Sequence, residues 1–412
     1  NNAGIASLAG LQYASNLSNL DLSNNQISDL TPLQHLSKLT KLYLDKNQIT
    51  DITPLRDLSN LSSLALNGNH VSDLTPLRDL SNLSFLALGE NQVSDLTPLQ
   101  HLSNLSWLHL GQNQISDVTP LKDLSNLSFL GLGYNQITDI TPLRDLSNLS
   151  QLYLMFNHIS DLTPLQNLNL TQFSASDQTI TLPTIYVLNK QPYSASVQTA
   201  IKNLNGTTPT ISPQNNDTWT GVYNSGKVEW SSANQVPETG DLVLTWTDQN
   251  TPFTGKCVQP YVLSKASITA HNSTIYVGDN WQARDNFDSA LDHDGNLLDF
   301  SKITVAGTVD TGRPGVYSIV YSYEGLEEKV NVTVKEKPST SEPSKGEVTP
   351  EGQPSTPEPS KGEVQSKKEK ASKKLPATGE KDTKIFSAIG LGILAILAIL
   401  GTYISRKKRS DS

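Results

Sequence analysis

One hydrophobic pattern recurs in the N-terminal part of the chain with a period of 22 residues. Between Leu17 and Leu170 the pattern L-x-x-L-x-L-x-x-N-x-[IV]-x-D-[LIV]-T-P-L-x-x-L occurs seven times. One polar column is constant in all copies and consists of Asn25, Asn47, Asn69, Asn91, Asn113, Asn135 and Asn157. A fixed period of this length predicts a solenoid, in which each copy forms one coil and buries its apolar side against its neighbours.

The columns of the repeat have separate structural roles. In each L-x-L segment the leucines point into the coil and the middle residue points to solvent, because successive side chains of a strand face opposite sides. The asparagine follows the strand, where its amide can bond backbone groups of its own and the neighbouring coil. Thr-Pro pairs such as Thr31-Pro32 are expected to be an N-cap and a first helical position, starting a helical or 3₁₀ turn.

This pattern is that of the leucine-rich repeat in its short bacterial form. It predicts an α/β-type solenoid over residues 1–170, with parallel strands on the concave face and 3₁₀ or helical turns on the convex face. Ile5, Leu8 and Leu11 fall into the apolar columns, so residues 1–16 correspond to the tail of a coil. Because the C-terminus (below) requires export, we expect a signal peptide and an N-terminal cap ahead of residue 1.

Aromatic residues occupy several solvent-facing positions of the predicted concave face. Phe85, Trp107 and Phe129 stand in one column of consecutive coils, so their rings are expected roughly 5 Å apart as a ladder. Small neighbours, among them Gly89 and Gly131, are expected to leave room for a partner. Apolar patches on a rigid face mark binding sites, and aromatic residues are common interface anchors. The candidate ligand-binding residues are Tyr43, Phe85, Trp107, His109, Phe129, Tyr134, Tyr153 and Phe156.

Two other interpretations of these aromatic residues stay open. They could pack on one another only to shield the sheet, because stacked rings protect each other from water. A sugar could stack on the same rings in place of a protein. The first half of the concave face is polar and is expected to contribute steering and specificity.

The period ends after Leu170, and two β-rich modules are expected to follow. Residues 171–264 contain short β-type runs between Gly, Pro and Asn clusters, which predicts a small sandwich that could cover the leucine edge of the solenoid. The expected strands there are Thr218–Val222, Lys227–Trp230, Leu242–Thr247 and Val258–Leu263. In residues 265–334, Lys329–Val334 alternates polar residues with valine, and Gly312–Gly315 is expected to be the turn before the strand Val316–Tyr323.

Residues 335–374 are rich in Ser, Pro, Glu, Lys and Gly and cannot bury a core. The phrase Glu-Pro-Ser-Lys-Gly-Glu-Val at 342–348 returns at 358–364. Such composition predicts an extended linker, long enough to carry a domain through a thick cell wall.

Residues 375–412 contain three signals in a fixed order. The pentapeptide is Leu375, Pro376, Ala377, Thr378 and Gly379. An apolar run over 385–404 follows, long enough for one membrane span, and the basic run 406–409 would hold its end in the cytoplasm. The order resembles the cell-wall sorting signal of Gram-positive bacteria. That resemblance implies that sortase cuts the Thr378–Gly379 bond and joins Thr378 to peptidoglycan, so that only the precursor lies in the membrane; an ordinary single-span protein is the alternative.

Composition limits the remaining functions. The 412 residues carry a net charge of −9, which argues against a nucleic-acid partner. Cys257 is the single cysteine and is expected to be inert. Asp292–Asn296 is similar to the start of a calcium loop but lacks the distal Glu, so a β-turn is expected. Neither a catalytic triad nor a metal-ligand spacing nor a phosphate loop is present, so we expect no enzyme activity, metal or cofactor.

The S-D-L-T-P-L phrasing of the repeats, the β module directly after them and the L-P-x-T-G tail together resemble the internalins, surface proteins of Listeria-type bacteria. The resemblance implies an Ig-like inter-repeat domain at 171–264 and a bacterial Ig-like domain around Tyr276–Asp279 and Asp285–Asp288. It implies a wall-anchored adhesin that binds a host cell-surface protein, or a glycan or mucin. A structural or biofilm wall protein without a specific receptor is the alternative of a different class.

Overall fold

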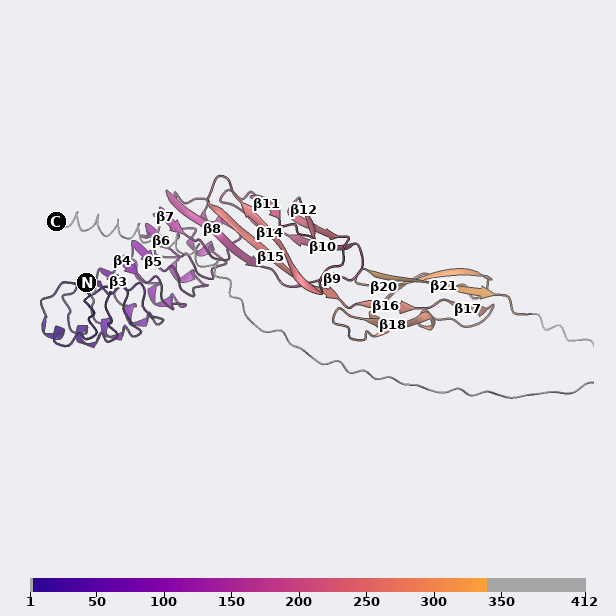
Figure 1. Ribbon diagram of the computed structural model, residues 1–412, viewed down its shortest axis with the longest axis horizontal. Coiled ribbons are helices and arrows are strands. Elements are labelled where there is room, and N and C mark those ends of the chain that lie inside the picture. The colour runs from indigo at the N-terminus through magenta and orange to yellow at the C-terminus, as the bar shows by residue number, and fades with distance from the viewer. Residues whose placement is uncertain (1–2, 339–412) are drawn as a thin grey trace, which may run out of the picture. The chain divides into compact units, whose positions relative to one another are not determined.

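The computed structural model describes residues 3–338 (Figure 1). Most of the predicted linker, the sorting pentapeptide and the apolar run 385–404 therefore lie outside the described residues. Within residues 3–338, none of the helices has the length and apolar character needed to cross a membrane.

The predicted solenoid is present, and its strands form one parallel sheet whose successive members follow one another in Figure 1. The strands are β1 (Asn19–Asp21), β2 (Lys41–Tyr43), β3 (Ser63–Ala65), β4 (Phe85–Ala87), β5 (Trp107–His109), β6 (Phe129–Gly131) and β7 (Gln151–Tyr153). The 3₁₀ helices are η1 (Leu11–Tyr13), η2 (Thr31–Leu33), η3 (Thr53–Leu55), η4 (Thr75–Leu77), η5 (Thr97–Leu99), η6 (Thr119–Leu121), η7 (Thr141–Leu143) and η8 (Thr163–Leu165). The strands pair in register, so Leu42 faces Leu64 and Leu86 faces Leu108.

The asparagine column forms a buried ladder between the coils. Asn135 is representative: its Nδ2 donates to the carbonyls of Leu110 and Leu132, both at 3.0 Å. Its Oδ1 accepts the backbone N–H of Ile115 in the preceding coil at 3.0 Å. A three-residue strand followed by a sharp turn leaves these backbone groups without partners, and the amide satisfies them inside an apolar core.

The Thr-Pro pairs start 3₁₀ helices, but the expectation that threonine is the N-cap is wrong. Thr31 is the first residue of η2, and no side-chain cap comes from Leu30 before it. The side-chain bond comes instead from Asp29, one residue before the N-cap position: its Oδ1 accepts the Thr31 N–H at 2.8 Å. Hydrogen bonds from the side chain and the backbone of Thr31 lower the pKa of Asp29. A carboxylate accepts this bond more strongly than a hydroxyl, because its charge assists.

The repeat continues one strand further than the sequence period indicates. Strand β8 (Gln172–Thr181) pairs in parallel with β7. Gln178 takes the position of the ladder asparagine, with Nε2 donating to the Leu154 carbonyl at 2.8 Å and Oε1 accepting the Ile159 N–H at 3.0 Å. Glutamine supplies the same amide on a longer side chain, so the ladder runs into the next module.

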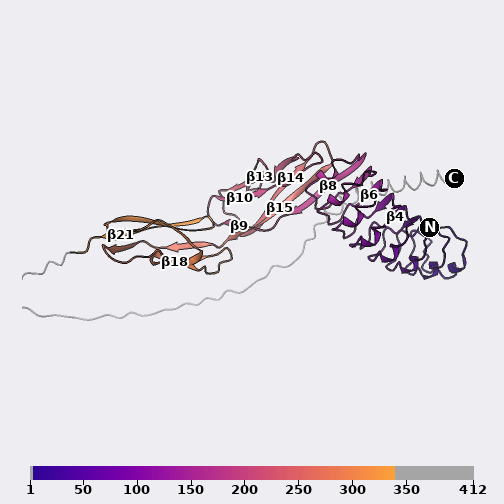
Figure 2. The same cartoon turned by 180° about the vertical axis from the view of Figure 1, so that it is seen from behind.

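The first β module shares a sheet with the solenoid: β8 is followed by β15 and then β14 in the sheet order, and Figure 2 shows these strands together. Its further strands are β9 (Ile185–Leu188), β10 (Tyr193–Gln198), β11 (Thr210–Pro213), β12 (Thr220–Asn224), β13 (Lys227–Ser232), β14 (Thr239–Thr247) and β15 (Phe253–Ser264). Strand β15 pairs with β14 antiparallel and with β8 and β9 parallel, and a second sheet has the order β10-β13-β12. Trp219, Trp230 and Trp246 are buried in a core that continues from the leucine columns. The four predicted strands are present as β12–β15, and β8–β11 were not predicted.

The second β module has its own core, formed by residues such as Ile303, Ile319 and Tyr321. Its elements are β16 (Ser267–Ala270), β17 (Ser273–Tyr276), η9 (Ala283–Asn286), β18 (Phe287–Leu291), η10 (Phe300–Lys302), β19 (Thr304–Ala306), β20 (Gly315–Tyr323) and β21 (Leu326–Lys335). Strands β16 and β18 pair with each other, and the second sheet has the order β17-β21-β20-β19. The alternation predicted in β21 is confirmed, because Val330 and Val332 are buried.

The ladder makes a testable prediction about stability. Asn135→Ala removes four hydrogen bonds and leaves the Ile115 N–H and the carbonyls of Leu110 and Leu132 unsatisfied in the core. The free energy of unfolding should therefore fall on the order of 3 kcal/mol or more. Asn126→Ala is the matched control, because Asn126 donates one exposed bond to the Ser103 carbonyl at 2.8 Å. Urea denaturation measures both, and equal losses would contradict the special role of the ladder.

Candidate ligand-binding face

The predicted aromatic ladder is present on the concave sheet. Phe85, Trp107 and Phe129 begin strands β4, β5 and β6 and lie opposite one another in register. The Phe85 and Trp107 ring centroids are 4.2 Å apart with an interplanar angle of 11°, and those of Trp107 and Phe129 are 4.5 Å apart at 10°. The strand spacing thus brings the three rings into face-to-face stacking.

Stacking buries these three rings almost completely. Phe85 and Trp107 are each 3% exposed and Phe129 is 4% exposed. Trp107 has a neighbouring ring on both faces, so a partner could meet it only at its edge. The burial therefore agrees with the interpretation that the stack shields the sheet. The three stacked rings form a rigid base of the concave face, called the floor below.

The expectation that small residues leave room for a partner is wrong at the centre of this face. The His109 imidazole occupies that space: a Cβ atom on Gly131 would lie 2.6 Å from His109 Cδ2. A Cβ atom on Gly89 would also collide with the same ring. The glycines make room for His109, which is 7% exposed.

The buried His109 ends a chain of polar side chains that continues through the half-buried Asn67 and Asp45. Its Nδ1 lies 3.2 Å from Asn67 Oδ1, which also accepts the Gly89 N–H at 2.8 Å. The Asn67 Nδ2 donates to Asp45 Oδ1 at 2.7 Å, which fixes the orientation of the amide. His109 Nδ1 therefore carries the proton, and Nε2 is the acceptor nitrogen. Burial lowers the pKa of His109 to about 4 and raises the pKa of Asp45, so the histidine is neutral at pH 7.

The most exposed candidate is Phe156, at 39%. Its ring stacks on Tyr134 with centroids 4.2 Å apart and an interplanar angle of 16°. Both residues have left-handed backbone conformation, with φ of 56° for Phe156 and 59° for Tyr134. This conformation is uncommon for bulky residues and costs free energy, and such strain is often found at functional sites. Both residues belong to the column just before the ladder asparagine, and every member of this column has positive φ. In the other coils the column contains Asn24, Lys46, Gly68, Glu90 and Gln112.

Tyr153 and Tyr43 differ in their distance from the ring stack of Phe85, Trp107 and Phe129. Tyr153 is half-buried, its ring centroid is 5.7 Å from that of Phe129, and its hydroxyl donates to Gln172 Oε1 at 2.7 Å. Tyr43 in β2 lies opposite Ala65, and strand β3 separates it from Phe85. Ring contacts thus connect five of the eight predicted residues: Phe85, Trp107, His109, Phe129 and Tyr153. Tyr134 and Phe156 form a separate pair, and Tyr43 lies apart from both groups.

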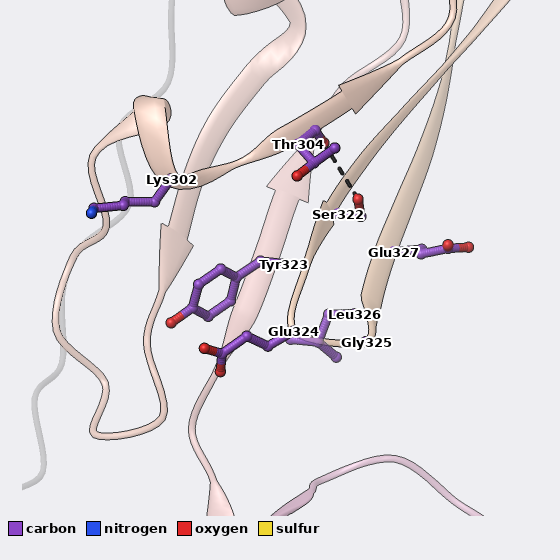
Figure 3. Close-up of a pocket in the computed structure, with 8 residues that line it drawn as sticks. All are labelled: Lys302, Thr304, Ser322, Tyr323, Glu324, Gly325, Leu326 and Glu327. Atoms are coloured by element: carbon purple, nitrogen blue, oxygen red, sulfur yellow. Dashed lines mark hydrogen bonds between the residues drawn. The ribbon is translucent and has the colours of Figure 1, made fainter.

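Two further features of the described residues lie away from this face. A surface hollow of about 420 Å³ in the second β module contains none of the predicted residues (Figure 3). It is lined by Lys302, Thr304, Ser322, Tyr323, Glu324, Gly325, Leu326 and Glu327. The Asp292–Asn296 segment forms a turn in which the Asp292 carboxylate accepts the N–H of Asn296 at 2.8 Å. Across residues 3–338, no group of three or more His, Cys, Asp or Glu side chains is placed to hold a metal ion.

Family models match three parts of the chain. Leucine-rich repeats match at 15–57, 103–145 and 125–167, and a bacterial Ig-like domain (group 3) matches at 268–334. The LPXTG cell wall anchor motif matches at 367–411. The chain is therefore a leucine-rich-repeat surface protein of the Gram-positive type, which sortase processes and attaches covalently to the peptidoglycan of the cell wall.

Several solved structures from Listeria monocytogenes are similar to this chain. Internalin C2 is 44% identical over 41% of this chain and 75% of its own, with a TM-score of 0.41. An internalin (inlF) is 32% identical over 43% and 66%, with a TM-score of 0.32. The functional domain of InlJ is 19% identical over 62% and 64%, with a TM-score of 0.47. A search of the curated proteins gave no match. By its identity to internalin C2, the chain belongs to the internalin family.

The buried histidine predicts a dependence of stability on pH. Its pKa is about 4 in the folded chain and 6.5 in the unfolded chain, so the unfolded state binds the proton more tightly. The free energy of unfolding should therefore fall as the pH decreases through 6.5 and level off near 4, by about 3 kcal/mol from this group. His109→Gln should flatten this part of the profile in urea denaturation, and the exposed His101→Gln should not. An unchanged profile in His109→Gln would contradict the burial of a neutral imidazole.

The cysteine gives a prediction about reactivity. Cys257 is 4% exposed, and burial raises the pKa of its thiol to about 11. Because the thiolate is the reactive form, labelling by a disulfide reagent at pH 7 should be negligible in the folded chain and complete in urea. Rapid labelling without denaturant would contradict the inert assignment.

Proposed function

We propose that the chain is an adhesin of internalin type, which binds a host cell-surface protein on the C-terminal half of its concave face. The observation that carries the proposal is the exposed Phe156 ring, which stacks on the half-buried Tyr134 in the coils that carry Tyr153 and Phe129. The cell-wall anchor motif supports it, because a wall-attached solenoid faces the surroundings of the cell. In this proposal sortase joins Thr378, which lies outside the described residues, to peptidoglycan.

The aromatic residues have different roles in this proposal. Phe156 and Tyr153 are the contacting side chains, since both keep part of their surface exposed. Phe85, Trp107 and Phe129 form the floor, and His109 fixes its centre. A side chain that is already ordered by stacking loses little conformational entropy on binding, which favours affinity.

A protein ligand agrees better with this geometry than a glycan does. Sugars pack their apolar sides on the faces of aromatic rings, where the π-system is accessible. In the stack those faces are covered at centroid distances of 4.2 and 4.5 Å, and one face of Phe156 is covered by Tyr134. A protein surface can instead pack around ring edges and one projecting phenyl group.

The test replaces Phe156 without disturbing the fold. Phe156→Asn removes the ring and keeps a residue that tolerates the left-handed conformation, as Asn24 does at the same place in the first coil. The full chain, displayed on a Gram-positive cell, should mediate adhesion to cultured mammalian cells, and Phe156→Asn should weaken it about tenfold or more. Gln112→Asn is the matched control, because Gln112 stands in the same column with φ of 57°.

Treatment of the target cells identifies the class of ligand. Protease treatment should abolish adhesion, and glycosidase treatment should leave it intact. Loss of adhesion by glycosidase alone would indicate a glycan, and adhesion no better than that of cells without the chain would support a structural wall protein. Full adhesion by Phe156→Asn would place the ligand elsewhere.

A further inference from the structure

The covalent order of the modules determines how a pulling force passes through the chain. The solenoid precedes β8, and the cell-wall anchor motif follows β21 in the sequence. A pull between the solenoid and the wall therefore enters the first β module at the start of β8 and leaves it at the end of β15. It enters the second module through β16 and β17 and leaves at the end of β21.

In the first module the loaded strands run parallel, and β15 is paired over most of its length with β8 and β9. Five residues of β15, between Phe253 and Val258, pair with β8. Four more, from Tyr261 to Ser264, pair with β9, which follows β8 along the same edge of β15. The Leu182 N–H also donates to the Val258 carbonyl at 2.9 Å between these two sets.

The second module repeats the arrangement on a smaller scale. Strand β17 pairs in parallel with β21 over four residues, from Ser273 opposite Val332 to Tyr276 opposite Lys335. The Val277 N–H extends the pair by donating to the Lys335 carbonyl at 2.8 Å, next to the end of β21. At the opposite end the Asn331 N–H donates to Asn272 Oδ1 at 2.7 Å.

The direction of the load decides how these hydrogen bonds fail. Two parallel strands that are pulled at opposite ends slide along their common axis, so all bonds of the pair carry the load together. Two strands that are pulled apart at the same end lose their bonds one after another. The rate of forced unfolding depends on the barrier, which is higher when several bonds must break at once.

We propose that a further function of both β modules is mechanical: β8 and β9 on β15, and β17 on β21, are clamps loaded in shear between the solenoid and the wall. They keep the modules folded while the attached cell is pulled. The first module, with its longer parallel pairing, is the stronger clamp. The proposal depends on wall attachment and not on the host ligand, so it can be tested without a ligand.

The experiment pulls one clamp of the full chain in two directions by single-molecule force spectroscopy. Asn272→Cys with Lys337→Cys places handles at opposite ends of the β17–β21 pair and loads it in shear. Asn272→Cys with Asn331→Cys places them at the same end and opens the pair bond by bond. All three positions are exposed, and Cys257 is buried. Both proteins carry Asn272→Cys, so the loss of the Asn272 hydrogen bond is the same in both and does not affect the comparison.

The shear geometry should give a peak unfolding force about twofold or more above the opening geometry, because four residue pairs share the load. Thr171→Cys with Lys265→Cys, which loads the first module in shear, should give a higher force again. Thermal denaturation should be the same for the two Asn272 proteins, which confirms that only direction differs. Equal forces in the two directions would overturn the clamp, and a weaker first module would overturn the ranking. Loss of host binding in Phe156→Asn would affect neither result.

Discussion

The structure depends on buried side-chain amides that complete the backbone hydrogen bonding of each coil. A strand of three residues provides no hydrogen-bond partners for the backbone N–H and C=O groups of the turn that follows it. Water cannot bond these groups either, because it is excluded from the core. One asparagine per coil supplies an acceptor to the preceding coil and donors to two carbonyls, as Asn47 and Asn135 show. This bonding fixes one coil to the next and aligns every column of the repeat. Gln178 extends the same bonding into β8, so the solenoid and the first β module share a sheet.

Alignment of the columns also determines the chemistry of the concave face. Residues 22 positions apart meet across the sheet, so Phe85, Trp107 and Phe129 stack and lose their exposed faces. The same alignment places His109 over the glycines of the neighbouring coils and beside Asn67. The centre of the face is therefore rigid and closed at neutral pH, and the proposed function places contact with a partner at its border, at Tyr153 and Phe156. A closed floor beside a projecting ring suits the selective binding of a protein surface.

Wall attachment gives the β modules a role beyond spacing. An adhesin carries force whenever its cell is displaced, and every module between ligand and wall carries the same force. Parallel pairing of the entering and leaving strands recurs in both modules, although their sheets differ in size and order. The binding proposal and the mechanical proposal therefore complement each other, since a rigid binding face is useful only if the modules behind it stay folded.

The sequence by itself determined the solenoid, the ladder asparagines, the wall anchor and the columns that face the concave side, because each depends on local periodicity or a short motif. The boundaries of the β modules stay predictions. Only the tertiary structure decided that Asp29 and not Thr31 caps the turn, that Gln178 continues the ladder, and that His109 fills the space above the glycines. It also decided that the three central rings are buried and Phe156 is not. The physical reason is that a residue's position in the repeat predicts only the direction of its side chain. The exposure of that side chain depends on which neighbouring side chains pack over it.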